Sequence, residues 1–229
     1  LGLIILHLLA SIAQAQGGPE VLVVDATGPV TPIMLSLIER AIVEADTRNA
    51  EALIIRLDTP GGSVELTQRI IQAMIGADVP VVVYVAPRDA IAGSAGALIT
   101  MAGHASAMAP NTVIGAASPI DSSGADIQST RETKVKETLK AKARTLVEDR
   151  GEEAVKLAEA MIDEATAVTA KEALEANLID FISDDTEDLL QSLDGFKVKM
   201  EDGERTLGTE NIRTENVEIN FIEQLLLML

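Results

Sequence analysis

Cysteine is absent from this chain of 229 residues, and its absence excludes three kinds of chemistry. Without a thiol the chain has no disulfide, no thiolate metal site and no cysteine nucleophile. Aromatic residues make up only 2% of the sequence although 47% of it is hydrophobic, so the interior must be built from Ala, Val, Ile, Leu and Met. This balance suits a layered α/β fold and provides little surface on which nucleic-acid bases could stack.

Positive charge and histidine are also scarce. The sequence has 18 Lys and Arg against 36 Asp and Glu, which gives a formal net charge of -18. Because phosphate binding needs clustered Lys and Arg, we expect no nucleic-acid partner. Histidine occurs only as His7 and His104, and neither belongs to an HExxH motif or to a carboxylate–histidine cluster. We therefore expect no metal site and no cofactor.

Both ends of the chain are apolar. The stretch Leu1–Leu9, followed by Ala13-Gln14-Ala15, has the form of the hydrophobic region and cleavage site of a secretory signal peptide. We therefore expect residues 1–15 to be a signal peptide that is clipped at its start, and the protein to be exported. Residues 221–229 are too few to cross a bilayer, which takes about 20 residues. We interpret them as the beginning of a membrane helix or as an amphipathic end.

Between the ends, strand-like and helix-like segments alternate. Aliphatic, β-branched runs predict buried strands at 21–24, 52–57 and 80–85. Apolar residues at helical spacing predict helices at 32–45, 64–75 and 94–102. This alternation favours an α/β fold in which a parallel sheet is connected by right-handed βαβ units.

The second half of the chain predicts a different set of elements. We expect an exposed loop at 121–130, a charged helix at 131–150, a further helix at 152–162 and a last core strand at 178–182. Thr169 and Glu172 have the spacing of a capping box, and Asp202-Gly203 predicts a hairpin. We expect a main domain at 20–194 and a small β appendage or linker at 195–229.

Two loops that contain glycine follow successive predicted strands. Asp58-Thr59-Pro60-Gly61-Gly62 follows the second strand, and Ala92-Gly93-Ser94-Ala95-Gly96 follows the third and opens a helix. Sites in open α/β sheets form beyond the carboxyl ends of the strands, and paired glycines allow backbone N–H groups to approach a ligand closely. The glycine pair alone is usually a tight turn, and the serine alone is usually an N-cap. Their joint placement indicates a site with Ser94 as nucleophile.

A serine nucleophile needs a base, and histidine does not supply one here. His7 lies in the predicted signal peptide, and on one helix His104 would lie about 15 Å from Ser94. A lysine is the alternative, provided that burial lowers its pKa from about 10.4 by about three units. From the residues alone, four lysines of the charged helix are equal candidates: Lys134, Lys136, Lys140 and Lys142.

Several motifs, taken in order, resemble the N-terminal peptidase domain of NfeD proteins, which are relatives of ClpP and of signal peptide peptidase A. The resemblance extends from about Glu20 to Ser183. The motifs are Thr59-Pro60-Gly61-Gly62, Ala92-Gly93-Ser94-Ala95-Gly96, Met108-Ala109-Pro110, Ile114-Gly115-Ala116, Val168-Thr169-Ala170-Lys171-Glu172-Ala173-Leu174 and Leu178-Ile179-Asp180.

The resemblance implies a ClpP/crotonase-like βαβ superhelical fold and a Ser–Lys dyad. The family's serine matches Ser94, and its lysine matches Lys134, with Lys136 as a close competitor. The N–H groups of Gly62 and Ala95 would form the oxyanion hole, with Gly61 in the same loop. The resemblance further implies an apolar peptide substrate, a stomatin-like membrane protein as partner, a homodimer, and association with the extracytoplasmic face of a membrane.

Three functions are compatible with this fold. A membrane-associated serine endopeptidase is the function we predict, because Ser94 and the lysines near Lys134 are both retained. A non-catalytic scaffold that binds a stomatin-like protein is the alternative, and loss of either group would have favoured it. A crotonase-type acyl-CoA enzyme would need neither Ser94 nor a lysine, and an exported location without CoA argues against it.

Overall fold

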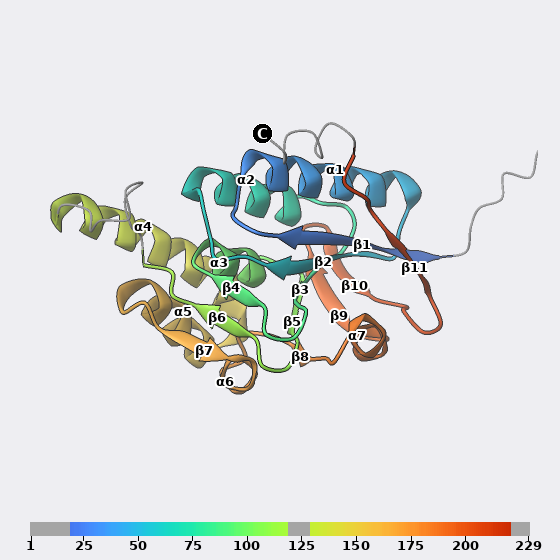
Figure 1. The fold of residues 1–229 in the computed structure, drawn as a ribbon. Coiled ribbons are helices and arrows are strands. Elements are labelled where there is room, and N and C mark those ends of the chain that lie inside the picture. Colours follow the sequence, from blue (N-terminus) through green and yellow to red (C-terminus); the bar gives the residue numbers. More distant parts are fainter. Residues whose placement is uncertain (1–18, 119–128, 221–229) are drawn as a thin grey trace, which may run out of the picture.

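In a computed structural model, the described part of the chain folds around a parallel β-sheet of six strands (Figure 1). The structure describes residues 19–118 and 129–220, so the predicted signal peptide, the apolar end and most of the predicted loop at 121–130 lie outside the described residues. Every neighbouring pair of strands in the sheet runs parallel, as predicted. In spatial order the strands are β11 (Arg213–Asn216), β1 (Glu20–Thr27), β2 (Ala52–Asp58), β3 (Val81–Val85), β5 (Ala105–Met108) and β8 (Phe181–Ile182).

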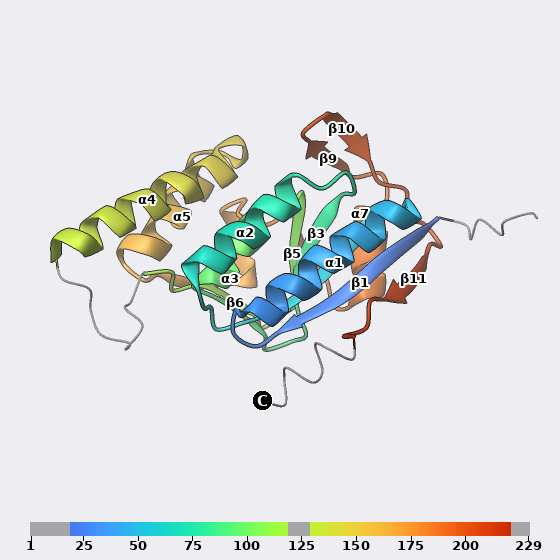
Figure 2. The same cartoon turned by 90° about the horizontal axis from the view of Figure 1, so that it is seen from above.

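Different elements cover the two faces of this sheet (Figures 1 and 2). One face is covered by α1 (Pro32–Arg48) and α2 (Val64–Ile75), and the other by α7 (Thr186–Leu193) and an antiparallel hairpin of β9 (Lys197–Met200) and β10 (Gly203–Thr206). Successive strand residues alternate between two hydrophobic clusters. Val24 and Ile55 belong to the cluster beneath α1 and α2, whereas Val23 and Ile54 belong to the cluster that contains α7. The strands are continuous apolar runs because both of their faces are buried.

Local signals explain where several helices begin and end. The Thr31 hydroxyl accepts a hydrogen bond from the N–H of Met34 at the start of α1, and Asn49 ends that helix in the left-handed conformation. The capping box of α6 (Ala170–Glu175) is confirmed, because Thr169 and Glu172 exchange backbone and side-chain hydrogen bonds. The predicted bounds of α2 agree with the structure at both ends.

A second, smaller sheet lies beside the first and was not predicted. It consists of β4 (Ile91–Gly93), β6 (Val113–Gly115) and β7 (Ala167–Thr169), with β4 parallel to β6 and β6 antiparallel to β7. Each strand has three residues, which is too short for a periodicity to be recognised in the sequence. The helices near this sheet are α3 (Ala95–Met101), α4 (Ser129–Val147), the 3₁₀ turn η1 (Glu148–Arg150) and α5 (Glu152–Asp163).

The structure differs from the sequence predictions at three further places. The last core strand is shorter than predicted: Leu178 and Ile179 are buried, but only Phe181 and Ile182 pair with β5. Asn177, at a φ of 56°, turns the chain there, so burial occurs without strand pairing. Helix α7 was not predicted, and β11 joins the main sheet next to β1 although the hairpin at Asp202-Gly203 forms as expected.

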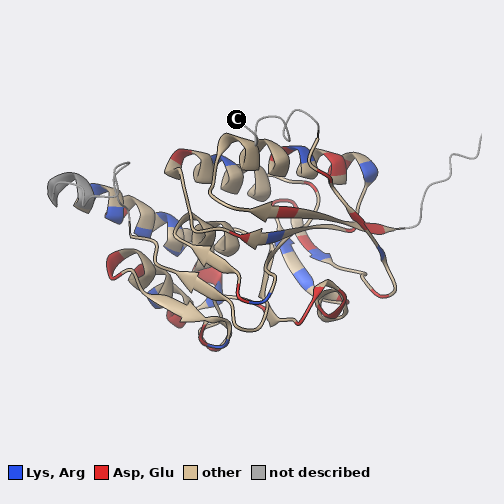
Figure 3. Ribbon diagram, viewed as in Figure 1, with Lys and Arg blue, Asp and Glu red and all other residues tan. Residues whose placement is uncertain are grey.

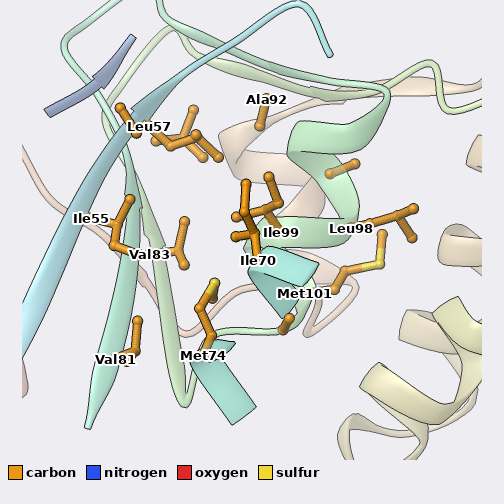
Figure 4. Close-up of a cluster of buried hydrophobic side chains, with 14 of the residues drawn as sticks. Ile55, Leu57, Ile70, Met74, Val81, Val83, Ala92, Leu98, Ile99 and Met101 are labelled. Atoms are coloured by element: carbon orange, nitrogen blue, oxygen red, sulfur yellow. The ribbon is translucent and has the colours of Figure 1, made fainter. Parts of the chain in front are cut away.

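The hydrophobic core holds α3 in a fixed place against the sheet. Figure 4 shows Ile70 and Met74 of α2 between the strands and α3, where both side chains are fully buried. Ile99 of α3 points toward the strands, while Leu98 points away from them. Because α3 begins directly after Ser94, the packing of this short helix determines where Ser94 lies.

Candidate active site

Ser94 occupies the N-cap position of α3 in an unusual backbone conformation. Its φ is 51° and its ψ is -110°, a region that costs a residue other than glycine about 1–3 kcal/mol. Its side chain makes no capping hydrogen bond to α3, so the hydroxyl is not used to stabilise the helix. The backbone N–H of Ser94 donates instead to the carbonyl of Gly115 in β6, at 2.7 Å. The half-buried hydroxyl is therefore available for another role.

The loop after β2 lies directly against the residues that precede Ser94. The N–H of Thr59 donates to the carbonyl of Ile91 at 2.7 Å, and the N–H of Gly93 donates to the carbonyl of Thr59 at 2.9 Å. A Cβ added to Gly61 would lie 2.7 Å from the Ser94 Cβ, so only glycine permits this approach. The two glycine loops that were identified in the sequence therefore meet.

Two hydrogen bonds fix the orientation of Gly61. Its N–H donates to Thr59 Oγ1 at 3.1 Å, and its carbonyl accepts from the N–H of Val30 at 2.8 Å. In a trans peptide the carbonyl of one residue and the N–H of the next point in opposite directions, so the N–H of Gly62 points away from Val30. Among the described residues, neither this N–H nor that of Ala95 has an acceptor. Both residues line the same cavity as Ser94.

That cavity has a volume of about 680 Å³ and lies between α2, α3 and α4. Its walls are largely aliphatic, and its polar groups come mainly from α2 and α4. The aliphatic lining residues are Val64, Ile71, Leu98, Leu139 and Leu146, and the polar ones include Gln68, Gln72, Thr138 and Lys142. A cavity of this size and composition beside a serine hydroxyl suits an apolar ligand.

Basic residues recur along α4 (Figure 3), and its four candidate lysines have different surroundings. Lys142 lines the cavity. Lys134 is exposed and is not among the residues that line it, although it lies two turns earlier on the same face of the helix. The Lys140 ammonium lies 2.6 Å from Asp163, and this hydrogen bond raises the pKa of Lys140 and keeps it protonated. Lys136 is half-buried.

His104 has a structural role, as its distance from Ser94 in the sequence predicted. Its Nδ1 accepts a hydrogen bond from the N–H of Val81 at 3.0 Å. Val81 begins β3, at the opposite end of that strand from the loop that leads to Ser94. Burial lowers the pKa of His104, so it is neutral at pH 7. In the described parts of the chain, no group of three or more His, Asp or Glu side chains could hold a metal ion.

The structure brings together Gly61, Gly62, Ser94 and Ala95, but it leaves Lys134 outside the cavity. Sequence reasoning missed the parts of the site that only support other residues, namely Val30, the Thr59 hydroxyl and Gly115. No sequence motif marks Val30, because it contributes only a backbone N–H, which donates to the carbonyl of Gly61. Gly115 lies within a motif that we did identify, but its hydrogen bond to Ser94 depends on a sheet that was not predicted.

Comparison with known sequences identifies relatives along the whole chain. Residues 20–217 match the family of the NfeD1b N-terminal domain. The membrane-bound protease PH1510 of Pyrococcus horikoshii is 33% identical over 231 residues, which cover 99% of this chain and 51% of that protein. The membrane protein NfeD1b of Bacillus subtilis is 30% identical over 125 residues, which cover 54% of this chain and 28% of that protein. The chain thus spans about half the length of PH1510, and its match to NfeD1b covers 28% of that protein.

Solved structures of a close relative have the same fold. A lysine-to-alanine mutant of the 1510-N membrane-bound stomatin-specific protease, in complex with a substrate peptide, superposes with a TM-score of 0.83 at 31% identity, over 91% of this chain and 96% of that one. A serine-to-alanine mutant of the same protease gives 0.82 at 30% identity, over 89% and 100% of the two chains. The ClpP-like fold that the motifs predicted is therefore confirmed.

Proposed function

This chain belongs to the NfeD1b N-terminal domain family, and on that premise we propose that it is a membrane-associated serine endopeptidase. One observation supports the proposal most directly. In the described part of the chain, Ser94 is held in a strained conformation with its hydroxyl unused, beside two backbone N–H groups without acceptors and at the edge of an aliphatic cavity. Strained backbone of this kind concentrates at functional sites, and a serine hydroxyl left unused there is what a nucleophile requires.

The geometry suggests how the reaction would proceed. Ser94 Oγ attacks the carbonyl carbon of the scissile peptide bond while a neutral lysine removes its proton. The N–H groups of Gly62 and Ala95 stabilise the oxyanion of the tetrahedral intermediate. The same lysine then donates that proton to the leaving amine as the C–N bond breaks. Water releases the acyl group from Ser94 in the second half of the reaction.

We propose Lys134 as the base, because it matches the lysine of the family's motif. Lys136 remains the close competitor, and Lys142 is a third candidate because it already lines the cavity. Lys140 does not suit the role, since its ion pair with Asp163 stabilises the protonated form.

The relatives and the cavity support proposals for the substrate and the partner. The aliphatic lining supports an apolar peptide segment as substrate. The related protease is described as membrane-bound and stomatin-specific, which supports a stomatin-like membrane protein as partner. We further propose that the chain forms a homodimer and acts at the extracytoplasmic face of a membrane. Within residues 19–118 and 129–220 we find no helix with the length and hydrophobicity needed to cross a bilayer.

A non-catalytic scaffold is the second candidate function. The observation that favours it is the exposed position of Lys134, outside the cavity that contains Ser94. In that case the cavity would bind the apolar segment of a stomatin-like protein without cleaving it. The two functions differ in one respect that can be measured, namely whether the bound peptide is cleaved in a reaction that depends on the Ser94 hydroxyl.

The deciding experiment measures cleavage of apolar peptides by the purified chain. Wild type is compared with Ser94→Ala, Lys134→Ala, Lys136→Ala and Lys142→Ala, and with Lys171→Ala as a control, since exposed Lys171 pairs only with Glu175 at 3.8 Å among the described residues. We expect the Ser94 variant and one of the three lysine variants of α4 to lose cleavage while remaining folded. Binding of an apolar peptide by both wild type and Ser94→Ala, without cleavage by either, would establish the scaffold instead.

A further inference from the structure

Thr59 is a fully buried polar residue beneath the candidate site. It does not line the cavity, so it cannot touch a substrate there. Its backbone N–H and carbonyl bond to Ile91 and Gly93 in β4, immediately before Ser94. Its hydroxyl accepts the N–H of Gly61. One residue therefore contacts both the loop that contains Gly62 and the strand that leads to Ser94.

The Thr59 methyl group contacts the start of α3 as well. A Cβ added to Gly96 would lie 2.6 Å from Thr59 Cγ2, which shows how closely the helix approaches this side chain. Gly96 follows Ala95, whose N–H is the second proposed oxyanion donor. The two donors come from segments more than thirty residues apart in the sequence, and Thr59 is in contact with both segments.

The hydroxyl of Thr59 and the N–H of Val30 together fix Gly61. The first accepts from the Gly61 N–H and the second donates to its carbonyl, so the peptide units on both sides of Gly61 are held. With its φ of 113°, Gly61 lacks the steric restriction that a side chain would impose, and hydrogen bonds must supply it. The Thr59 hydroxyl also donates to the Gly61 carbonyl at 3.4 Å, so without it Val30 alone, among the described residues, would hold the peptide that contains the Gly62 N–H.

We propose that Thr59 is a positioning residue that sets the direction of the Gly62 N–H relative to that of Ala95. The inference rests on the proposed peptidase function. An oxyanion hole stabilises the transition state only when its donors lie about 2.7–3.1 Å from the developing charge. Misdirecting one donor therefore lowers kcat, while KM, which reflects contacts in the cavity, stays nearly constant.

The hydroxyl and the methyl group can be separated by substitution. Thr59→Val keeps the shape and the contact with Gly96 but removes the acceptor of the Gly61 N–H. Thr59→Ser keeps the acceptor but removes the methyl group. If Thr59 only fills space, the valine variant is the milder change; if the hydroxyl positions Gly61, the serine variant is the milder one.

The experiment compares kcat and KM for cleavage of an apolar fluorogenic peptide by the purified wild type and both variants. Thr209→Val is the matched control, because Thr209 is also buried and its hydroxyl donates to the carbonyl of Leu190 far from Ser94 in the sequence and fold. We expect Thr59→Val to lower kcat by about 10- to 100-fold with KM changed less than about threefold, which is below the roughly 100- to 1000-fold effect of deleting a donor. Thr59→Ser and Thr209→Val should keep kcat within about threefold of wild type.

A second measurement distinguishes the peptidase function from the positioning role of Thr59. It follows, by intact mass, the rate at which a fluorophosphonate labels Ser94 covalently. If wild type is labelled at Ser94 and cleaves the peptide, the peptidase function is supported. If Thr59→Val is then labelled as fast as wild type, or faster than Thr59→Ser, only the role of Thr59 is overturned. Wild type that neither labels nor cleaves overturns the peptidase function and the positioning role with it. Thermal unfolding of each variant is recorded alongside, and Thr59→Ser tests the hydroxyl even where Thr59→Val melts early.

Discussion

The N–H of Ser94 donates a 2.7 Å hydrogen bond to the carbonyl of Gly115, so the second sheet holds the backbone of the candidate nucleophile. Gly115 is the last residue of β6, which pairs with β4 on one side and β7 on the other. Because β4 ends at Gly93, the chain must turn sharply between that strand and α3. The small sheet therefore stabilises the unfavourable φ of Ser94 that the turn requires.

This strain leads to a prediction about stability at position 94. Replacing Ser94 by glycine should give a more stable protein than replacing it by alanine, by about 1 kcal/mol in the free energy of unfolding, because only glycine adopts a φ of 51° without strain. Both variants lose the hydroxyl and should be inactive. Urea unfolding of the two proteins measures the difference.

Ser192 in α7 is the control for that prediction. It lies in the last turn of α7 with an ordinary negative φ, and its hydroxyl donates to the carbonyl of Asp188. There the order should be reversed, with alanine more stable than glycine by about 1 kcal/mol. If alanine were the more stable replacement at both positions, Ser94 would not be strained.

Gly115 should tolerate no side chain. A Cβ added there would lie 2.3 Å from the carbonyl oxygen of Thr166, and its φ of 131° disfavours any other residue. Gly115→Ala should therefore separate β6 from β7, lower the free energy of unfolding by about 2–4 kcal/mol and reduce peptide cleavage at least tenfold. Gly151→Ala is the matched control, because Gly151 has a φ of 104° with no atom within 4 Å. It should cost only about 1 kcal/mol, and equal losses in the two variants would contradict the argument.

Three central strands of the main sheet, β1 to β3, and the helices α1 and α2 that cover one of its faces could be predicted because each signal is local. The buried runs, the caps at Thr169 and the spacing of α2 involve neighbours in sequence, and the structure agrees with them. The second sheet could not be predicted, because its strands are short and pair with strands more than twenty residues away in the sequence. Ser94 and the glycine pair were found because they belong to motifs at strand ends. The choice among lysines stayed open because it depends on burial, which spacing does not reveal.

The charge cluster around Arg48 should hold β11 to the sheet. Arg48 donates to the nearly buried Glu20 in β1 and to Glu215 in β11, and Arg213 of β11 also contacts Glu20. Hydrogen bonding to Arg48 lowers the pKa of Glu215. Arg48→Gln should therefore make the backbone amides of β11 and of Val217 exchange with solvent about tenfold faster, measured by hydrogen–deuterium exchange.

Arg69→Gln is the control for that exchange experiment. Arg69 forms an exposed pair with Glu39 at 3.2 Å, and exposed pairs contribute little to stability. Loss of this pair should leave the exchange rates of the β11 backbone amides unchanged. If the two variants exchange alike, the hydrogen bonds between β1 and β11 are sufficient without the charge cluster.

Ionisation of Tyr84 should lower the stability of the protein at high pH. Its hydroxyl donates to the carbonyl of Ser183 at 2.7 Å, and burial, with the nearby Asp185, raises the pKa of Tyr84 to about 12. The unfolded chain has a tyrosine pKa of about 10. Between about pH 10 and about pH 12 the folded state therefore keeps a proton that the unfolded state has lost. The stabilisation is complete below about pH 10 and is lost as pH rises toward about 12.

The sequence makes this measurement clean, because it has one tyrosine and no tryptophan. Absorbance at the tyrosinate band therefore titrates Tyr84 alone, and we expect a midpoint near 12 in buffer that falls to about 10 in urea. Tyr84→Phe should lower the free energy of unfolding by about 1–2 kcal/mol at pH 7, because the Ser183 carbonyl loses its buried donor. The loss should shrink as pH rises through the same range, since wild type then loses the contribution that the variant already lacks. A difference between the two proteins that stays constant with pH would mean that Tyr84 ionises as freely in the folded chain as in the unfolded one.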